Sequence, residues 1–278
     1  MSNLNDNNIT MKHVNEVENY EDKKIIVCDF FKSINLSPPI DISEIIIHSI
    51  NNIKPISFLK FGDGEHSCIF NPCGQNCDND RYTHKLSFAL KNSIVSLTKN
   101  NKSYYIGRWN NRKVIDDYNN LCNDKINYAD YHTFIILGTS HMEGYLDKKK
   151  VKIYKSIKTS KIKKIMVCNS LLINAQKLLN IDYMIFIPLN NWFDTEFEKV
   201  LNYISEIITN NNSEPHMILT CCGMSSKVLI YELSKIHNNS LYFDIGSALD
   251  FLCRKHDTRG YKNLYSYEYL LDLFKELL

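Results

Sequence analysis

Short hydrophobic runs alternate with stretches of helical periodicity along most of this chain of 278 residues. The runs are bounded by Gly, Pro, Asn or Ser, and this pattern predicts buried strands. Between the runs, apolar residues recur every three or four positions, which is typical of helices with one buried face. We expect strands at 56–61, 103–107, 133–137, 165–168, 184–187, 216–220 and 240–243. We expect helices at 43–52, 85–97, 116–126, 171–179, 195–208, 225–235 and 264–277.

The alternation of strands and helices predicts an α/β fold, with a Rossmann-like, mostly parallel sheet flanked by helices. Residues 1–22 are polar and aperiodic, so we expect a flexible N-terminal arm. No later change of composition marks a second unit, and we expect residues 23–278 to form a single domain. In a parallel sheet the loops that follow the strands share one rim, where ligands bind. These loops are 62–66, 107–112, 138–144, 169–170, 188–194, 221–226 and 244–250.

Composition and charge narrow the class of protein. Hydrophobic residues make up 44% and charged residues 23% of the chain, as in ordinary globular proteins. A net charge of +2 gives no reason to expect a nucleic acid or an anionic membrane as partner. No apolar stretch approaches the roughly 20 residues of a membrane-spanning helix, and residues 1–19 lack the apolar core of a secretory signal. The nine cysteines, an odd number, argue against a disulfide framework, so we expect a cytoplasmic protein.

The segment 56–65 combines an expected strand with a Gly-Asp-Gly-Glu turn at its C-terminal end. Asp63 and Glu65 are two residues apart, and in a turning backbone such side chains point to the same side. Two carboxylates on one side of a loop suit a hard divalent cation such as Mn²⁺ or Mg²⁺. Gly62 and Gly64 would let the backbone approach whatever this cation holds. The alternative interpretation is a solvated turn, because Asp and Gly are common in turns.

One segment resembles the Arg-Phe-Gly-Asp-Gly-Glu signature of the GT-D type glycosyltransferases, namely Lys60-Phe61-Gly62-Asp63-Gly64-Glu65. The lysine in place of the usual arginine keeps the charge and loses the bidentate geometry of a guanidinium. Three later segments are similar to the family in the same order, at 187–192, 218–223 and 243–246. The resemblance covers residues from about 40 to 255. The continuation at 246–250 departs from the His-bearing version of the family, so the acceptor is not implied.

The resemblance implies a GT-D-like, metal-dependent glycosyltransferase of the hexosyltransferase type. Such an enzyme moves a sugar from a nucleotide diphosphate sugar, a UDP-sugar by default, to a glycan or glycoprotein acceptor. Asp63 and Glu65 would then lie at a Mn²⁺ or Mg²⁺ ion that bridges the donor phosphates and neutralises charge on the leaving group. The resemblance is compatible with a homo-oligomer and does not require one.

The predicted rim also supplies residues for binding the donor and the acceptor. Gly223 precedes a helix whose free amides can hold a phosphate, although Ser225 can instead cap that helix. Arg108 at a strand end suits a phosphate or the acceptor, and a surface salt bridge is equally compatible. Trp109 or Trp192 can stack on a base or a sugar, although tryptophan most often packs in a core. The candidate substrate-binding residues are Lys60, Gly62, Gly64, Arg108, Asn190, Trp192, Gly223, Ser225 and Ser226.

An inverting transferase needs a general base near the acceptor hydroxyl. Acidic residues on the predicted rim are the candidates, and we take as candidate catalytic residues Asp244, Glu143 and Asp250. Asp244 is favoured because it ends an expected strand within the segment similar to the family's closing motif, and the alternative is a turn cap. The same rim also carries His141 and Asp194.

Other classes of protein and other sites fit parts of the sequence. A Rossmann-type methyltransferase would carry an acidic residue at the end of the second strand, whereas the second expected strand ends in Gly107-Arg108. A non-catalytic nucleotide- or sugar-binding protein of the same fold would not need paired carboxylates. A basic cluster beyond the last strand could hold a diphosphate or a charged acceptor, and the alternative is a solvated surface. It consists of Arg254, Lys255, His256 and Arg259. Cys68, Cys73 and Cys77 could suggest a metal site, but structural zinc usually has four ligands, and His66 and His84 do not complete a familiar pattern.

Overall fold

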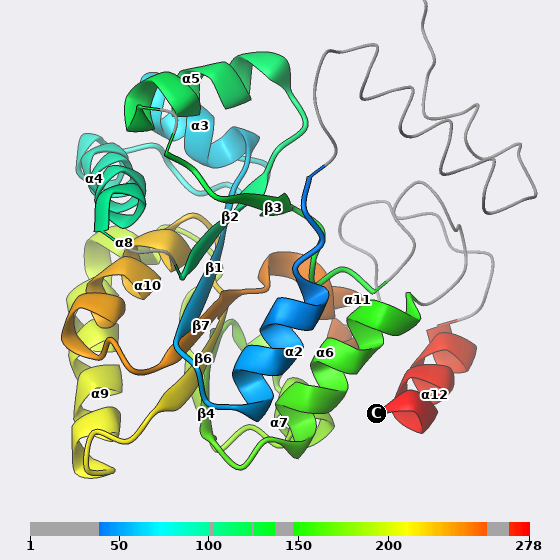
Figure 1. Cartoon of the computed structure of the whole chain (residues 1–278). Helices are drawn as coiled ribbons and strands as arrows, with labels where there is room; N and C mark the ends of the chain where they lie inside the picture. The colour runs from blue at the N-terminus through cyan, green and yellow to red at the C-terminus, as the bar shows by residue number, and fades with distance from the viewer. Residues whose placement is uncertain (1–38, 101–102, 124, 137–146, 255–266) are drawn as a thin grey trace, which may run out of the picture.

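The computed structural model describes residues 39–100, 103–123, 125–136, 147–254 and 267–278. In these ranges seven strands form one sheet in the order β3-β2-β1-β7-β6-β4-β5, and every pairing is parallel. The predicted α/β fold with a parallel sheet is therefore confirmed (Figure 1). The strands are β1 (Ile56–Phe61), β2 (Tyr104–Arg108), β3 (Tyr128–Asp130), β4 (Lys163–Cys168), β5 (Tyr183–Phe186), β6 (His216–Cys221) and β7 (Leu241–Asp244).

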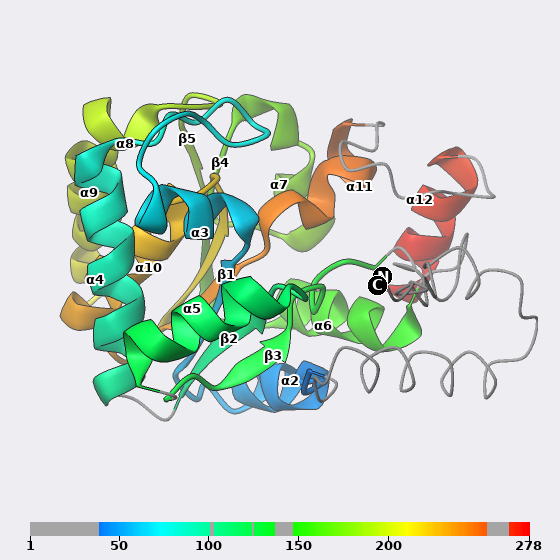
Figure 2. The same cartoon turned by 90° about the horizontal axis from the view of Figure 1, so that it is seen from above.

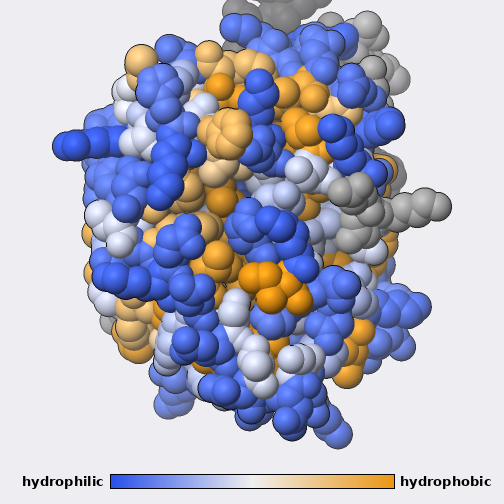
Figure 3. All heavy atoms as spheres, turned by 90° about the vertical axis from the view of Figure 1, so that its left-hand side faces the viewer, coloured by the Kyte–Doolittle hydropathy of each residue, from blue (hydrophilic) through white to orange (hydrophobic). Residues whose placement is uncertain are grey.

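Helices cover both faces of this sheet (Figures 1 and 2). One face carries α2 (Ser43–Asn51), α6 (Lys148–Thr159), α7 (Ala175–Leu179), α11 (Asp250–Arg254) and α12 (Tyr267–Leu277). The opposite face carries α4 (His84–Asn100), α5 (Arg112–Cys122), α8 (Trp192–Thr195), α9 (Phe197–Asn210) and α10 (Ser225–Ile236). Hydrophilic side chains dominate the outer surface of α4 and α9, with small hydrophobic patches between them (Figure 3). No helix in the described ranges is long and apolar enough to cross a bilayer.

Side chains of each strand alternate between two hydrophobic cores, one on each face of the sheet. Phe58 packs in the core beneath α2 and α6, where its ring lies 5.5 Å from that of Phe134. Leu59 and Phe61, on the same strand, pack in the core beneath α4 and α10. All six residues of β1 are buried, as expected for a central strand of a parallel sheet that is covered on both faces.

The structure corrects two sequence predictions and adds a helix that the sequence analysis did not expect. No strand forms over 133–136, the described part of the strand expected at 133–137, because the backbone turns after Asp130, whose carboxylate accepts a hydrogen bond from His132 N–H at 3.0 Å. Phe134 is nevertheless buried, so hydrophobicity there reflects packing against the sheet rather than strand pairing. The lysine-rich stretch after 147 forms α6, and Asp147 caps it. The Gly-Asp-Gly-Glu segment is not a turn but the start of α3 (Asp63–Phe70).

Candidate active site

A cavity of about 890 Å³ lies at the carboxyl end of the sheet. It is lined by residues that follow β1, β6 and β7, by the loop 75–80, and by residues next to β3 and β5. Six of the seven predicted rim loops contribute residues to this cavity, and the seventh, 138–144, lies outside the described residues. This is the place where open parallel sheets bind ligands, at the point where the strand order changes direction.

The helical start of α3 separates the two carboxylates that the sequence analysis placed side by side. Residues two apart in a helix point about 200° away from each other. Asp63 is exposed and lines the cavity, and its Oδ1 accepts from Gly64 N–H at 3.0 Å. Glu65 is only 6% exposed, and its Oε2 accepts from Gly62 N–H at 2.8 Å. The expected turn, in which both side chains point to the same side, is therefore wrong, although both residues line the same cavity. Their role as metal ligands stays a prediction.

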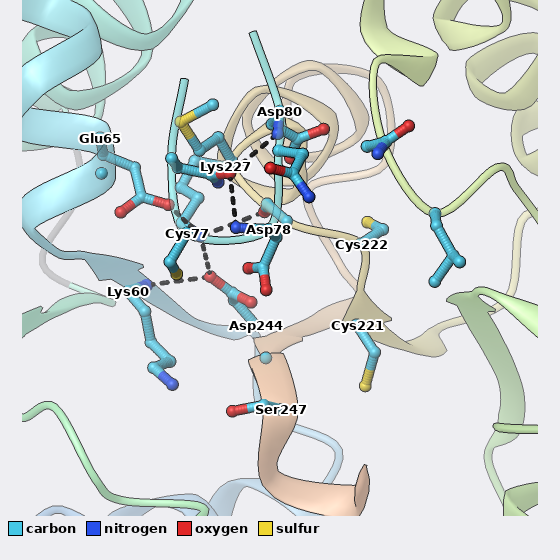
Figure 4. Close-up of a pocket in the computed structure, with 18 of the residues that line it drawn as sticks. Lys60, Glu65, Cys77, Asp78, Asp80, Cys221, Cys222, Lys227, Asp244 and Ser247 are labelled. Carbon is cyan, nitrogen blue, oxygen red and sulfur yellow. Dashed lines mark hydrogen bonds and ion pairs between the residues drawn. The ribbon is translucent and has the colours of Figure 1, made fainter. Parts of the chain in front are cut away.

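Lys227 on α10 joins the buried carboxylates at the base of the cavity. Its Nζ lies 2.7 Å from Oε1 of Glu65 and 2.9 Å from Oδ2 of Asp244, and it donates to the carbonyl of Gly223 at 3.2 Å. Figure 4 shows Glu65 and Asp244 reaching toward this position from different elements. Burial alone would lower the pKa of Lys227, but Asp244 and Glu65 raise it above its ordinary value, so this lysine is charged.

Asp244 ends β7 and keeps one oxygen available. Its Oδ2 accepts from Lys60 N–H at 3.2 Å, in addition to its ion pair with Lys227. Its Oδ1 is buried and has no hydrogen-bond partner among the described residues. A buried carboxylate oxygen without a donor is unfavourable, so a hydrogen bond from a water molecule or from a ligand in the cavity would stabilise it.

A second carboxylate, that of Asp80, lies against the turn before α10. Its Oδ1 accepts from Asn191 N–H at 2.7 Å. Gly223 has a φ of +68°, and a Cβ built on it would lie 2.5 Å from Oδ2 of Asp80. Burial raises the pKa of Asp80. A carboxylate thus already faces the N-terminal turn of α10, where the sequence analysis expected a phosphate.

The two lysines of the site lie in different places. The Lys60 side chain points away from Glu65 and toward Ser247 (Figure 4). Its Nζ lies 4.4 Å from the centre of the Tyr131 ring, in a cation–π contact. Trp109 packs edge-on against the same tyrosine, with ring centres 4.9 Å apart, and both aromatic side chains line the cavity.

Several predicted site residues lie outside the cavity. Trp192 is 1% exposed and donates its indole N–H to the carbonyl of Cys222 at 3.0 Å, so it is a core residue. Ser226 is buried with its hydroxyl 3.1 Å from the Cys222 sulfur. Arg108 is buried at the end of β2, and it does not line the cavity, nor do Ser225 and Gly62.

The other predicted site residues either line the cavity, lie away from it, or fall outside the described residues. The cavity lining includes Lys60, Gly64, Asn190, Gly223, Asp244 and Asp250. The carboxylate of Asp250 lies 3.4 Å from the guanidinium of Arg254. Asp194 is exposed elsewhere. The described ranges do not include Glu143, His141, Lys255, His256 and Arg259.

Sequence reasoning missed the roles of Lys227, Asp80 and Tyr131, all of which line the cavity. Their contacts join segments far apart in the chain, and no local sequence pattern predicts such contacts. The described residues contain no group of three or more His, Cys, Asp or Glu side chains arranged to hold a metal ion. Cys68 is buried, and Cys73 and Cys77 are exposed.

Fold and site together define an α/β protein with a polar, carboxylate-rich cavity at the carboxyl edge of a parallel sheet. No known family profile matches the sequence, and no curated protein matches it either. A solved structure of the domain of unknown function 1792 superposes with a TM-score of 0.52 at 17% identity, over 82% of this chain and 90% of that chain. A second structure of that domain, described as having a distinct glycosyltransferase fold, gives 0.50 at 17% identity, over the same shares. At this identity the likeness establishes the fold.

Proposed function

We propose that this protein is a glycosyltransferase that moves a sugar from a nucleotide diphosphate sugar, a UDP-sugar by default, to a hydroxyl of a glycan or glycoprotein acceptor. The observation that carries the proposal is the buried, unpartnered Oδ1 of Asp244 at the base of the cavity. The similar structure described as having a glycosyltransferase fold supports the same class of reaction. A cavity of about 890 Å³ is in the range that holds a ligand of nucleotide size.

In this proposal Asp244 is the general base. Its Oδ1 takes the proton of the acceptor hydroxyl. At the same time the hydroxyl oxygen of the acceptor bonds to the anomeric carbon of the donor sugar. The bond between the anomeric carbon and the phosphate oxygen breaks, and its electron pair leaves with the nucleoside diphosphate. Lys60 N–H and Lys227 hold the other oxygen of Asp244, so the carboxylate presents a fixed edge to the acceptor.

The charge of the cavity favours a donor that arrives with a divalent cation. Six carboxylates and three basic side chains line the cavity. The carboxylates are those of Asp63, Glu65, Asp78, Asp80, Asp244 and Asp250, and the basic side chains are Lys60, Lys227 and Arg254. A diphosphate alone would be repelled by this excess of negative charge. Mg²⁺ commonly binds through one or two carboxylates together with substrate phosphates.

Of the two predicted metal ligands, Asp63 fits such an ion and Glu65 does not. Asp63 is an exposed carboxylate on the cavity wall. Both oxygens of Glu65 are engaged, one by Gly62 N–H and one by the Lys227 ammonium. When bound, Mn²⁺ or Mg²⁺ would neutralise charge on the departing diphosphate.

The decisive experiment measures release of nucleoside diphosphate from a panel of nucleotide sugars with Mn²⁺. We expect Asp244→Asn to lower kcat by about 10²- to 10⁴-fold. The control is Asp116→Asn, an exposed aspartate on α5 that pairs with Arg112 away from the cavity. Full activity of the Asp244 variant would refute the assignment of the base.

Thermal shift separates the rival functions, because a ligand that binds the folded state raises the melting temperature. A shift with S-adenosylmethionine and none with nucleotide sugars would indicate the methyltransferase. A shift with nucleotide sugars but no turnover with any acceptor would indicate a non-catalytic binding protein.

A further inference from the structure

The second carboxylate of the Asp-Gly-Glu segment lies at the base of the cavity, and the protein itself binds both of its oxygens. Glu65 lies in the first turn of α3, where its Oε2 accepts the backbone N–H of Gly62 at 2.8 Å. Its Oε1 lies 2.7 Å from the ammonium of Lys227. The carboxylate is 6% exposed, so a metal ion would have to approach it across a buried positive charge.

Lys227 is held just as completely. A lysine ammonium has three protons to donate, and here Glu65, Asp244 and the carbonyl of Gly223 take them at 2.7, 2.9 and 3.2 Å. The three partners belong to α3, to the end of β7 and to the turn before α10. Lys227 therefore has no proton left for a substrate, and its effect on chemistry passes through the groups that it holds.

We propose that Glu65 holds Lys227 in place of a metal ion, and that Lys227 positions Asp244 with Oδ1 toward the cavity. Of the Asp63–Glu65 pair, only Asp63 then remains for a divalent cation. The role of Lys227 in positioning Asp244 rests on the proposed function, whereas the assignment of Glu65 does not. Lys227 is thus a positioning residue, and Glu65 is its anchor.

Binding of Mn²⁺ to the full chain tests the assignment of Glu65. The loss of the free-ion signal in electron paramagnetic resonance measures it, with and without UDP. We expect Asp63→Asn to weaken Mn²⁺ binding by about 10- to 100-fold and Glu65→Gln to leave it within about two-fold. Equal losses in the two variants, or no binding by the wild type under either condition, would overturn the division of roles.

A thermal-stability cycle tests the contact itself and needs no ligand. Lys227→Met leaves two buried carboxylates without their counter-charge, and we expect a loss of about 6 to 20 °C in melting temperature. The double variant with Glu65→Gln should melt higher than Lys227→Met alone, because one uncompensated charge is gone. The matched control is Lys235→Met on the same helix, whose ion pair with Glu232 is exposed. Strictly additive losses would show that Glu65 does not anchor Lys227.

Kinetics test the positioning of Asp244. We expect Lys227→Met to lower kcat by about 100-fold with little change in KM for the donor, and Lys227→Arg to recover part of kcat. A large rise in KM at unchanged kcat would mean that Lys227 binds substrate, which overturns the positioning role. If the wild type turns over no nucleotide sugar, the proposed function and the positioning role fail together. The assignment of Glu65 still stands or falls on the metal and stability measurements.

Discussion

Gly223→Ala is a sharp test of how the turn before α10 is built. The residue has a φ of +68°, a conformation that costs a residue with a Cβ about 1 to 2 kcal/mol. The new Cβ would also lie 2.5 Å from Oδ2 of Asp80, so the carboxylate has to move. Moving it breaks the 2.7 Å hydrogen bond from Asn191 N–H, and a hydrogen bond to a charged group contributes about 1.5 to 3 kcal/mol.

The free energy of unfolding should therefore fall by about 2.5 to 5 kcal/mol, which corresponds to roughly 5 to 20 °C in melting temperature. Calorimetry or circular dichroism measures this directly. Gly64→Ala is the matched control, since its Cβ would meet Asn76 at an ordinary 3.4 Å and alanine favours the helix. We expect that variant to melt at or above the wild-type temperature.

A second substitution isolates the contribution of Asp80. If the clash with its carboxylate matters, Asp80→Ala combined with Gly223→Ala should lose less stability than the sum of the two single losses. A loss below about 3 °C in Gly223→Ala, or an equal loss in Gly64→Ala, would refute the reasoning. An additive double variant would leave backbone strain as the whole effect.

Two further predictions concern the tryptophans and pH. Trp192→Phe should lower the melting temperature, because the carbonyl of Cys222 loses its indole donor. Trp109→Phe should leave the melting temperature nearly unchanged and raise the KM for the substrate, because Trp109 lines the cavity. Burial raises the pKa of Asp80 above its ordinary value of 3.8, so the folded chain holds this proton more tightly. The free energy of unfolding should therefore fall as pH rises from 3.8 through the raised pKa. Asp80→Asn, which keeps the acceptor for Asn191 N–H, should lose that dependence in pH-dependent calorimetry. The gain in the free energy of unfolding over the wild type should be greatest above the raised pKa and vanish below 3.8. An unchanged dependence of stability on pH would contradict this.

Much of the fold was predictable because strands buried on both faces have nearly continuous hydrophobic sequences. β1, β4 and β6 appear as such runs, and the structure confirms them. The run at 133–137 has the same composition, but its described part, 133–136, packs as irregular chain, so composition alone could not separate pairing from burial. In α6, the many lysines concealed a buried stripe that includes Val151, Tyr154 and Ile157.

The site was less predictable than the fold. A local signal for the start of α3 was available, since Gly62 is followed three residues later by Glu65, whose carboxylate accepts the Gly62 N–H as in one half of a capping box. The two glycines nevertheless favoured a turn, and the geometry of the carboxylates was wrong for that reason. The ion pairs of Lys227 join positions far apart in sequence, and nothing in a single sequence specifies such a contact.

The register of the sheet explains why these distant carboxylates meet. β1 and β7 are neighbours, with Phe58 opposite Phe243, so Asp244 comes level with Leu59 near the end of β1. There its side chain accepts from Lys60 N–H, which continues the hydrogen bonding between the strands by one step. The same end of β1 leads directly into α3, which brings Glu65 close to Asp244. Two buried carboxylates this close would repel each other, and Lys227 makes the arrangement stable. The sheet thus sets where the charges meet, and one lysine on α10 allows them to remain there.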